Sequence, residues 1–596
     1  MVAKAFSRSL TKFARQRRWQ VQSIGTRALF QSAASNTKES SSSNLAPLLG
    51  GSALFLGALC LKEQGDSFKT TRLEAPPSSN STISEPGNGD DDDDDDGEET
   101  TDVINWSGTH QVSVKSKNLF EPESLEEVEA IVKERHQKGQ TIRPLGSSLS
   151  PNGIALNQDG MISMVNMDQV LDIDTKNNTI TVQAGITVSK AVEALRKHKL
   201  TLPNLASIAE QQFGGFVQVS AHGTGRLIAP VDHYVTKLKL VTPALGTITL
   251  TKEENGALFE LAKVGLGCLG VVVEVTMECI PAHKLVEHTF TLTRQQAREQ
   301  KDNLLKKHKH MRYMWIPYTD TVVVVTNDPE DQVPKGTPRF QSPAGSNAQK
   351  MAPLTNLLAE LHGEKGITYD SEVVQGMGFG EVRDALLAFD PLDIDHVKRC
   401  NQAEADFWTK NEGYQTQPSD KLLQFDCGGQ QWVFEVCFPT GTIETNNDND
   451  TKFMEQLLEG IEKNGIPAHS PIEQRWSAAS SSTMSPAHGP EDGLFCWIGI
   501  INYLPSDDLD QRNAITNLFT GSYSDLVRKV GRPVQMVSHW AKLEEPRSVT
   551  KAVDMKMIYQ DRYPVTEFNR ARALFDPKNI LSNKLLDLVF GVPKES

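Results

Sequence analysis

The stretch Arg143-Pro-Leu-Gly-Ser-Ser-Leu-Ser-Pro-Asn152 decides how the fold of this chain is interpreted. It follows a short predicted strand over 141–143, and it combines small residues with the turn formers proline and glycine. Small side chains leave backbone N–H groups accessible, and successive N–H groups in a turn form a concavity that holds phosphate oxygens. The stretch therefore predicts a loop that wraps the pyrophosphate of a nucleotide cofactor.

Two further glycine-rich stretches lie downstream. The first is Asn204-Leu-Ala-Ser-Ile-Ala-Glu-Gln-Gln-Phe-Gly-Gly215, which runs on to Ser220-Ala-His-Gly-Thr-Gly225; alone, such a run is more often a turn than a site. The second, Gly265-Leu-Gly-Cys-Leu-Gly270, matches the G-x-G-x-x-G dinucleotide fingerprint. That fingerprint requires a strand before it and a helix after it, whereas here a helical pattern precedes and the β-branched run 271–276 follows. We therefore reject a Rossmann site and predict a tight entry into a strand.

Charged and reactive side chains form a second group of candidates near the C-terminal half. Glu473 and Arg475 are two residues apart in a predicted strand, so their side chains lie on one face. His539 and Lys542 share the segment Ser538-His-Trp-Ala-Lys542, and Cys427 follows Phe425-Asp426. Taken alone, each has a structural alternative: an ion pair, a packed histidine or an inert small residue. No Ser-His-Asp or metal-ligand spacing competes with them.

The pattern of apolar residues predicts an α+β protein. Ser124 and Glu127 form a capping box before a helix that ends near Gly139. Strands over 171–174 and 179–183 surround a turn, and a helix follows over 189–198. Strands and helices alternate up to Cys279, and mixed elements with long polar loops follow. The domains expected from this pattern are a cofactor domain over 104–283, a substrate domain over 284–545 and a C-terminal segment over 546–596.

Charge is concentrated in one segment. The formal net charge is −15, yet residues 85–102 hold eleven acids and no Lys or Arg. Residues 64–103 are rich in Ser, Pro, Gly and Asp, so a disordered linker is predicted there. An acidic chain without a basic stripe argues against nucleic acid as a partner. It is compatible with a basic protein partner, although such a run is more often a solvated linker.

The first 61 residues carry targeting patterns. Residues 1–38 contain eight basic residues and no acid, and Phe6, Leu10 and Phe13 fall on one helical face. This composition predicts a mitochondrial transit peptide; a plastid address or a basic tail is the alternative. Residues 45–61 are uncharged over 17 positions, the lower limit for spanning a bilayer. They are a candidate inner-membrane anchor or cleaved sorting signal, or else the apolar part of a discarded leader.

From about Asn105 to Asn583 the chain resembles the aldonolactone oxidoreductase branch of the vanillyl-alcohol-oxidase type FAD family, and within it the plant-type lactone dehydrogenases. The shared blocks, in order, are RP-GS-LSPNG, LASI-EQQ-GG, AHGTG, LVTPA-GTI, IPYTDTVVVVT, FDCGGQQWV, PIEQRW, HWAK and ILSN. The resemblance implies an α+β fold made of a PCMH-type, two-subdomain FAD-binding domain and a substrate, or cap, domain. The leader and the Asp-rich linker lie outside it.

The resemblance also implies roles for individual residues. Glu473 and Arg475 would bind the lactone, Lys542 would lie near the flavin N1–C2=O edge, and Cys427 would be redox-sensitive. Ala206 matches a position beside the flavin where alanine accompanies poor oxygen reactivity. The residues implied for the FAD site are Pro144, Leu145, Gly146, Ser147, Ser148, Leu149, Ser150, Ala206, Ser207, Gln212, Gly215, Val219, Ser220, Ala221, His222, Val272 and Lys542. No metal is implied.

The implied reaction is the oxidation of L-galactono-1,4-lactone to L-ascorbate, the final step of ascorbate biosynthesis, with electrons passing to cytochrome c. The implied location is the mitochondrial inner membrane or its intermembrane-space side. Two alternatives remain: an aldonolactone oxidase that uses O₂, and a role in the assembly of respiratory complex I. Leu149 and Ala206 argue against the oxidase.

Leu149 occupies the position where many relatives carry a histidine bonded to the flavin. Leucine cannot form that bond, so we predict non-covalent FAD. Acid precipitation should release the flavin into the supernatant, where its absorbance is measured. Flavin that stays in the wild-type pellet would contradict the prediction. A Leu149→His variant is the companion, and covalent flavin is expected there if the loop has the inferred geometry.

Overall fold

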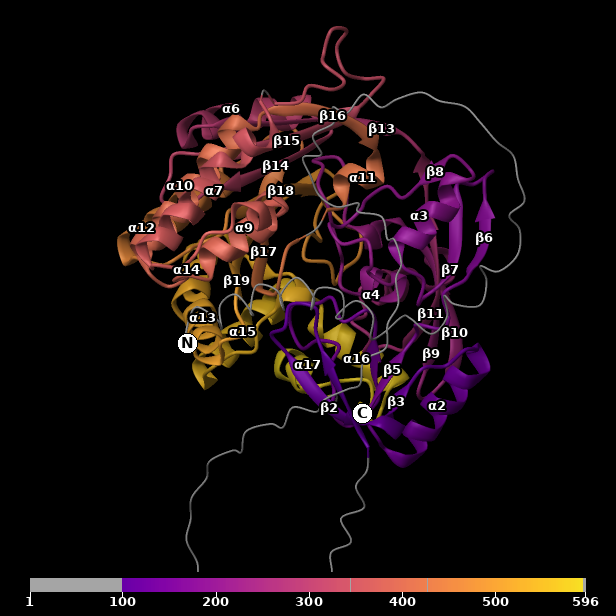
Figure 1. Ribbon diagram of the computed structural model, residues 1–596. Helices are drawn as coiled ribbons and strands as arrows, with labels where there is room; N and C mark the ends of the chain where they lie inside the picture. The colour runs from indigo at the N-terminus through magenta and orange to yellow at the C-terminus, as the bar shows by residue number, and fades with distance from the viewer. Residues whose placement is uncertain (1–98, 344, 426, 593–596) are drawn as a thin grey trace, which may run out of the picture.

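The described part of the chain forms five β-sheets with helices around them, and the two largest sheets have five and eight strands (Figure 1). The computed structural model describes residues 99–343, 345–425 and 427–592. The predicted transit peptide, the candidate membrane segment and most of the predicted linker therefore lie outside the described residues. Within the described part, no helix is both long and apolar enough to cross a membrane.

The structure corrects the C-terminal end of the predicted linker. Residues 100–103 are not a linker, because they belong to β1 (Thr100–Ile104), which pairs antiparallel with β2 (Gln111–Lys115). Val103 of β1 and Val114 of β2 are buried in the same small hydrophobic cluster. Pairing with β2 and burial of Val103 in this small core therefore order the segment that follows the acidic run.

The first subdomain is a small parallel sheet of order β3-β5-β4, built from Leu119–Phe120, Met161–Ser163 and Arg143–Leu145. Strand β4 lies two residues later than predicted, because Arg143, Pro144 and Leu145 are the residues in register with β5. Pro144 is accepted there because β4 is an edge strand. Helix α2 (Leu125–Lys138) precedes it, capped by Ser124 and ended by Gly139 at φ 63°, as the sequence predicts.

The second subdomain is a five-stranded antiparallel sheet of order β10-β9-β11-β7-β6. Strand β11 starts directly after Gly270, which confirms that the G-x-G-x-x-G run enters a strand and not a Rossmann helix. The strands are β6 (Val170–Asp174), β7 (Thr179–Gln183), β9 (Val235–Thr242), β10 (Gly246–Thr251) and β11 (Val271–Glu278), and the helices are α3 (Val188–Arg196), α4 (Phe213–Gln218) and α5 (Lys252–Ala262). The short strands β8 (Leu200–Thr201) and β12 (Ile280–Pro281) pair beside them.

An eight-stranded antiparallel sheet of order β16-β13-β15-β14-β18-β19-β17-β20 forms the other half. Its strands are β13 (Lys284–Leu292), β14 (His310–Trp315), β15 (Val322–Pro329), β16 (Gly413–Pro418), β17 (Gln431–Thr442), β18 (Ile472–Ala478), β19 (Gly493–Tyr503) and β20 (Val537–Ser538). The helices of this half are α6 (Arg294–Lys307), α7 (Asn347–Glu364), α8 (Ser371–Gln375), α9 (Phe379–Leu387), α10 (Ile394–Lys410), α11 (Ser419–Leu423), α12 (Asn449–Asn464), α13 (Leu509–Leu518) and α14 (Ser524–Gly531).

Side-chain alternation gives this large sheet two different faces. On β17, Phe434, Val436 and Phe438 pack into one core with residues of α6, α12 and α14. The intervening residues face the other way, toward the five-stranded sheet, and Cys437 joins the core of that half. The face turned away from these helices is therefore free to form a site between the two sheets.

The C-terminal helices α15 (Val549–Arg562), α16 (Val565–Phe575) and α17 (Lys584–Phe590) return to the first half of the chain (Figure 1). Phe568, Leu586 and Phe590 share one buried core with Val132 and Ile142. The division at 283/284 stays a prediction about folding units, although β12 ends at Pro281 and β13 begins at Lys284.

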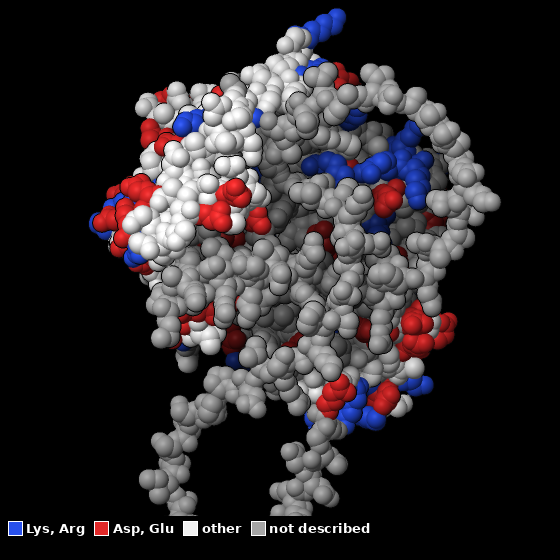
Figure 2. Space-filling view, in the orientation of Figure 1, with Lys and Arg blue, Asp and Glu red and all other residues white. Residues whose placement is uncertain are grey.

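Surface charge is unevenly distributed. Figure 2 shows basic side chains gathered around the end of α3, where Arg196, Lys197 and Lys199 are exposed, and acidic side chains over α12. Asp420 pairs with Arg196 at 2.6 Å, so part of this basic charge is neutralised within the molecule.

Arg143 ties the first half to the C-terminal segment, which generates a stability prediction. Its buried guanidinium donates to the carbonyls of Ile154 (2.9 Å), Leu581 (2.7 Å) and Leu266 (2.5 Å). Arg143→Met should leave the buried carbonyls of Leu266 and Leu581 without an N–H donor, at about 1–3 kcal/mol each, whereas Ile154 keeps the amide of Asn583. We expect a loss of ~3 kcal/mol or more in the free energy of unfolding, measured by thermal or urea unfolding.

The matched control is Arg399→Met, which removes an arginine that pairs with Glu364 on an exposed helix surface. This change should cost about 1 kcal/mol or less. Equal losses in the two variants would show that Arg143 has no special role in joining the distant segments.

Candidate active site

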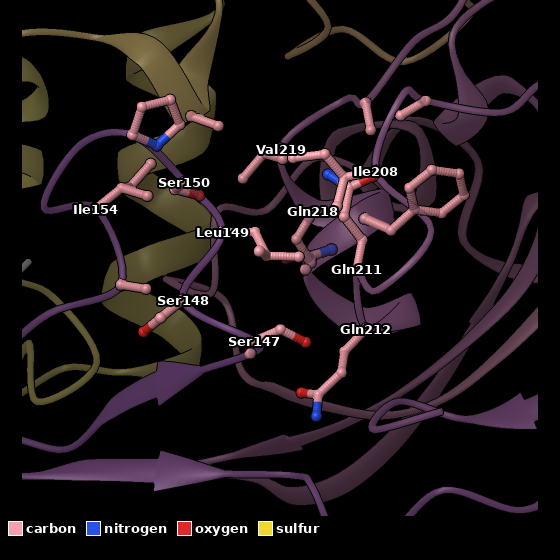
Figure 3. Close-up of a pocket in the computed structure, with 18 of the residues that line it drawn as sticks. Ser147, Ser148, Leu149, Ser150, Ile154, Ile208, Gln211, Gln212, Gln218 and Val219 are labelled. Carbon is pink, nitrogen blue, oxygen red and sulfur yellow. The ribbon is translucent and has the colours of Figure 1, made fainter. Parts of the chain in front are cut away.

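A cavity between the two large sheets collects the predicted site residues (Figure 3). One wall is the loop after β4 together with the segment from Ala206 to Val219 and the start of β11. The other wall comes from β17, β18 and β19 and from the 3₁₀ turn η5 (Trp540–Lys542). The predicted residues that line it are Pro144, Leu145, Gly146, Ser147, Ser148, Leu149, Ser150, Ala206, Ser207, Gln212, Gly215, Val219, Ala221, His222, Val272, Cys427, Glu473, Arg475 and Lys542.

The loop Gly146–Ser150 is held from both ends. Trp106 donates its backbone N–H to the carbonyl of Ser148 at 2.8 Å, and Asn105 donates to the carbonyl of Ser150 at 3.1 Å. Ser147 Oγ donates to the carbonyl of Glu210 at 2.8 Å, which joins the loop to the opposite glycine-rich stretch. In Figure 3 the side chain of Leu149 points into the space between these two stretches.

The chemistry of this end of the cavity fits FAD. Ser148 Oγ, Gln211 Oε1 and Gln212 Oε1 are buried polar atoms that have no hydrogen-bond partner among the described residues. Buried polar atoms are nearly always satisfied in folded proteins, so these three are suited to a polar ligand. Gly215 lines the cavity, and a Cβ placed on it would meet no atom within 4 Å. The backbone there is consequently open to a bound group.

The structure corrects the predicted cofactor site at one residue, Ser220. Its side chain does not line the cavity, because its Oγ donates to Asp232 Oδ1 at 2.7 Å and lies 2.7 Å from Ser485 Oγ. The residue is fully buried with φ 59°, so the turn directs its side chain inward. Sequence reasoning included it because its neighbours Val219 and Ala221 do line the cavity.

Two carboxylates lie in one row across three strands at the other end. Glu435 on β17, Gly499 on β19 and Glu473 on β18 are register partners. Gly499 has no side chain, so space remains between the two carboxylates. Arg475 spans that space: its Nη2 is 2.5 Å from Glu435 Oε1 and its Nε is 3.3 Å from Glu473 Oε2. The predicted placement of Glu473 and Arg475 on one face is therefore confirmed.

Lys542 reaches the same carboxylate from η5. Its Nζ donates to Glu435 Oε2 at 2.5 Å. The turn that presents it is fixed by Asn152, whose amide donates to the carbonyls of Trp540 and Leu543, both at 2.9 Å. The last residue of the stretch that opens the cofactor loop thus positions a cation at the far end of the cavity.

The electrostatics of this cluster follow from burial and pairing. Burial alone would raise the pKa of Glu435, but Lys542, Arg475 and His222 outweigh it and hold that pKa well below its usual value. Burial lowers the pKa of His222 to about 4 and that of His539 well below its usual value, so both imidazoles are neutral at pH 7. His222 stacks on the Trp497 ring at 3.7 Å.

His222, Glu435 and His539 place ligand atoms within 4.8 Å of one another, an arrangement that resembles a metal site. The surrounding charges do not fit a metal ion. Lys542 and Arg475 already neutralise Glu435 and would repel a cation at the same place.

Glu435 is the important residue that sequence reasoning missed. A signal was present: it is the one charged residue in the apolar run Trp432-Val-Phe-Glu435-Val-Cys-Phe438. Charged side chains are rarely fully buried unless they are paired, so a lone acid in a buried strand marks a hidden partner. His539, which was noted but left without a role, is also in the cavity wall.

Cys427 lies where the resemblance predicts it, half-buried in the cavity wall. Its Sγ is 3.8 Å from the carbonyl of Phe425. Its redox sensitivity stays a prediction.

Comparisons with known proteins agree with this geometry. The FAD binding domain family matches residues 116–252, and the D-arabinono-1,4-lactone oxidase family matches residues 275–358 and 385–589. L-galactono-1,4-lactone dehydrogenase 2, mitochondrial, of Oryza sativa subsp. japonica is 47% identical over 82% of this chain and 84% of its own length. The Arabidopsis thaliana L-galactono-1,4-lactone dehydrogenase, mitochondrial, is 45% identical over 82% and 81%.

Other matches are more distant. The L-gulonolactone oxidase of Bos taurus is 27% identical over 82% of this chain and 97% of its own. Among solved structures, a solvent-stable cholesterol oxidase superposes with a TM-score of 0.61 at 15% identity, covering 82% of this chain and 97% of its own. At that identity the likeness shows the fold alone.

An FAD-binding half joined to an aldonolactone-oxidase half defines a flavin-dependent oxidoreductase of the PCMH-type α+β fold, and FAD is its cofactor. The identity to the plant enzymes narrows the class further. The chain belongs to the L-galactono-1,4-lactone dehydrogenase family.

Gly215 provides a test of the cofactor wall. Gly215→Leu should fold, because a Cβ there meets no atom within 4 Å, but the side chain should fill the cavity. We expect flavin affinity to fall about tenfold or more, at least ~1.4 kcal/mol. The flavin-to-protein absorbance ratio after gel filtration measures it.

The control is Gly363→Leu, an exposed glycine of α7 that likewise has no atom within 4 Å of its added Cβ. This variant should keep its flavin. Normal flavin content in the Gly215 variant would exclude this part of the wall from the FAD site.

Proposed function

We propose that this protein oxidises L-galactono-1,4-lactone to L-ascorbate. One observation carries the proposal: Glu473, Arg475 and Lys542 converge at one end of a cavity whose other end fits FAD. The names of the 45–47% identical relatives specify that lactone, and the same polar cluster suits a polyhydroxylated ring.

The roles of the side chains follow from their donor and acceptor capacity. Arg475 is buried and presents several N–H donors in a fixed plane, so it can bind lactone oxygens. Glu473 is partly exposed to the cavity and accepts hydrogen bonds from substrate hydroxyls. Bound FAD supplies the hydride acceptor of the reaction. Lys542 provides a fixed positive charge where negative charge develops, which lowers the barrier.

The electron acceptor that we propose is cytochrome c. Cytochrome c is basic, so the formal charge of −15 favours its approach. Ala206 lines the cavity, which is the placement expected of a residue beside the flavin. The names of the plant relatives include "mitochondrial", which supports a mitochondrial location, and within the organelle we propose the inner membrane or its intermembrane-space side. An O₂-using oxidase is the runner-up, and a complex I assembly role is compatible with the enzyme.

Arg475→Met tests the substrate role. Removing one partner of a buried charged contact should cost about 2–5 kcal/mol, or ~30- to 4,000-fold in kcat/KM, while flavin remains bound. Turnover is measured with L-galactono- and L-gulono-1,4-lactone, using cytochrome c or oxygen, on protein starting near residue 99.

Arg383→Met is the control, since Arg383 is a largely buried arginine whose side chain is 11% exposed, stacks 3.9 Å over Tyr503 and does not line the cavity. It should retain turnover. Undiminished kcat/KM in the Arg475 variant overturns the substrate role, and oxygen consumption as fast as cytochrome c reduction overturns the acceptor.

A further inference from the structure

We propose that Glu435 is a positioning residue that holds Arg475 and Lys542 together in their working orientation. The proposal rests on the proposed function, because it assigns the organiser of that same site. The contacts of the two carboxylate oxygens of Glu435 support this role.

Each oxygen of Glu435 has its own cation. Oε1 accepts from Arg475 Nη2 and Oε2 accepts from Lys542 Nζ, both at 2.5 Å, and His222 Nε2 is 3.3 Å from Oε2. The side chain is 2% exposed. Arg475 comes from β18, and Lys542 comes from η5 after β20. One carboxylate therefore links two segments that have no ion pair with each other.

The backbone of Glu435 contributes to the same link. Its carbonyl accepts the N–H of His539 at 2.9 Å, and His539 is the N-cap of the turn that carries Lys542. Asn152 holds the other side of that turn through the carbonyls of Trp540 and Leu543. The Lys542 turn is thus fixed on one side by the loop after β4 and on the other by Glu435.

Other roles for Glu435 fit the site less well. A general base needs an available oxygen and a pKa near the working pH, whereas both oxygens are engaged and the pKa of Glu435 lies well below its usual value. A metal ligand would compete with two cations. Direct contact with substrate is the role of Glu473, whose carboxylate is 20% exposed.

The charge balance gives the role a physical consequence. Glu435 and Glu473 are the carboxylates of the cluster, and Arg475 and Lys542 are its cations, with Arg312 Nη1 at 3.9 Å from Glu473 Oε1. The imidazoles of His222 and His539 are neutral, so Glu435 offsets one of these positive charges. Removing the charge of Glu435 leaves a net positive cluster beside the FAD site. A positive field favours the reduced flavin, so the midpoint potential should become more positive.

The experiment uses flavin-loaded protein in five forms, which are the wild type, Glu435→Gln, Glu435→Asp, Lys542→Met and the Glu435→Gln/Lys542→Met double variant. In Glu435→Gln we expect kcat to fall about 30-fold or more and the flavin midpoint potential to become more positive. Glu435→Asp keeps the charge but is one methylene shorter, so kcat should fall while the potential stays near the wild-type value.

A double-mutant cycle separates positioning from an independent contribution. In the wild-type background, Glu435→Gln should lower kcat about 30-fold. If Glu435 acts through Lys542, the same substitution made in the Lys542→Met background should lower kcat by less than about threefold. The control Asp450→Asn removes another buried carboxylate, paired with Lys301 at 2.7 Å on the helix-covered face of the sheet. It should leave both kcat and the potential unchanged.

Additive losses in the cycle, or an unchanged potential in Glu435→Gln, overturn the proposal. If Glu435→Gln does not retain flavin, Glu435→Asp decides: wild-type kcat in that variant contradicts the need for simultaneous reach to both cations. If the wild type does not oxidise the lactone, the proposed function fails. The midpoint potential still tests Glu435 separately, because its measurement needs no substrate.

Discussion

The guanidinium of Arg143 is the interaction on which the position of the cofactor loop depends. It donates to carbonyls of Ile154, Leu266 and Leu581, which belong to the cofactor loop, the entry to β11 and the C-terminal segment. Asn583 reinforces the same junction by donating to the carbonyls of Gly153, Ile154 and Leu156. Since these acceptors are buried, the loop after β4 cannot move away without leaving polar groups unpaired.

That fixed loop has a consequence at the opposite end of the cavity. Asn152 ends the loop and holds the turn that carries Lys542, and Glu435 holds the same turn from β17. The FAD end and the charged end of the cavity are therefore parts of one hydrogen-bonded frame. Rigid support of this kind is what a preorganised site requires, because catalytic charges that must reorganise stabilise a transition state poorly.

The sequence predicts those parts of the structure that depend on interactions between residues close together in the chain. Ser124 caps the start of α2 and Gly139 caps its end, because capping acts over a few residues. The β-branched run after Gly270 forms a strand, because branched side chains favour extended backbone locally. The face shared by Glu473 and Arg475 follows from strand alternation. The lining of the cavity by nearly all residues implied by the family resemblance shows that long sequence blocks carry three-dimensional information.

The failures share a cause, which is tertiary pairing. Strand β4 begins at Arg143 because of its register with β5, and β1 forms by pairing with β2 and by burying Val103 in a core shared with Val114. Neither partner can be identified from local composition. Ser220 points away from the cavity for the same reason, since its hydroxyl donates to the carboxylate of Asp232 and contacts the hydroxyl of Ser485. Glu435 was missed because its partners come from two other segments of the chain.

The comparison with cholesterol oxidase indicates where functional information lies in this fold. At 15% identity the fold is still shared, with a TM-score of 0.61, so different core side chains can support the same fold. On β17, β18 and β19, one set of alternate residues packs under helices and can vary in this way. The other set contains Glu435, Gly499, Glu473 and Arg475 and faces the cavity. Because strand alternation separates the two sets, the chemistry of the site can change while the sheet that supports it remains the same.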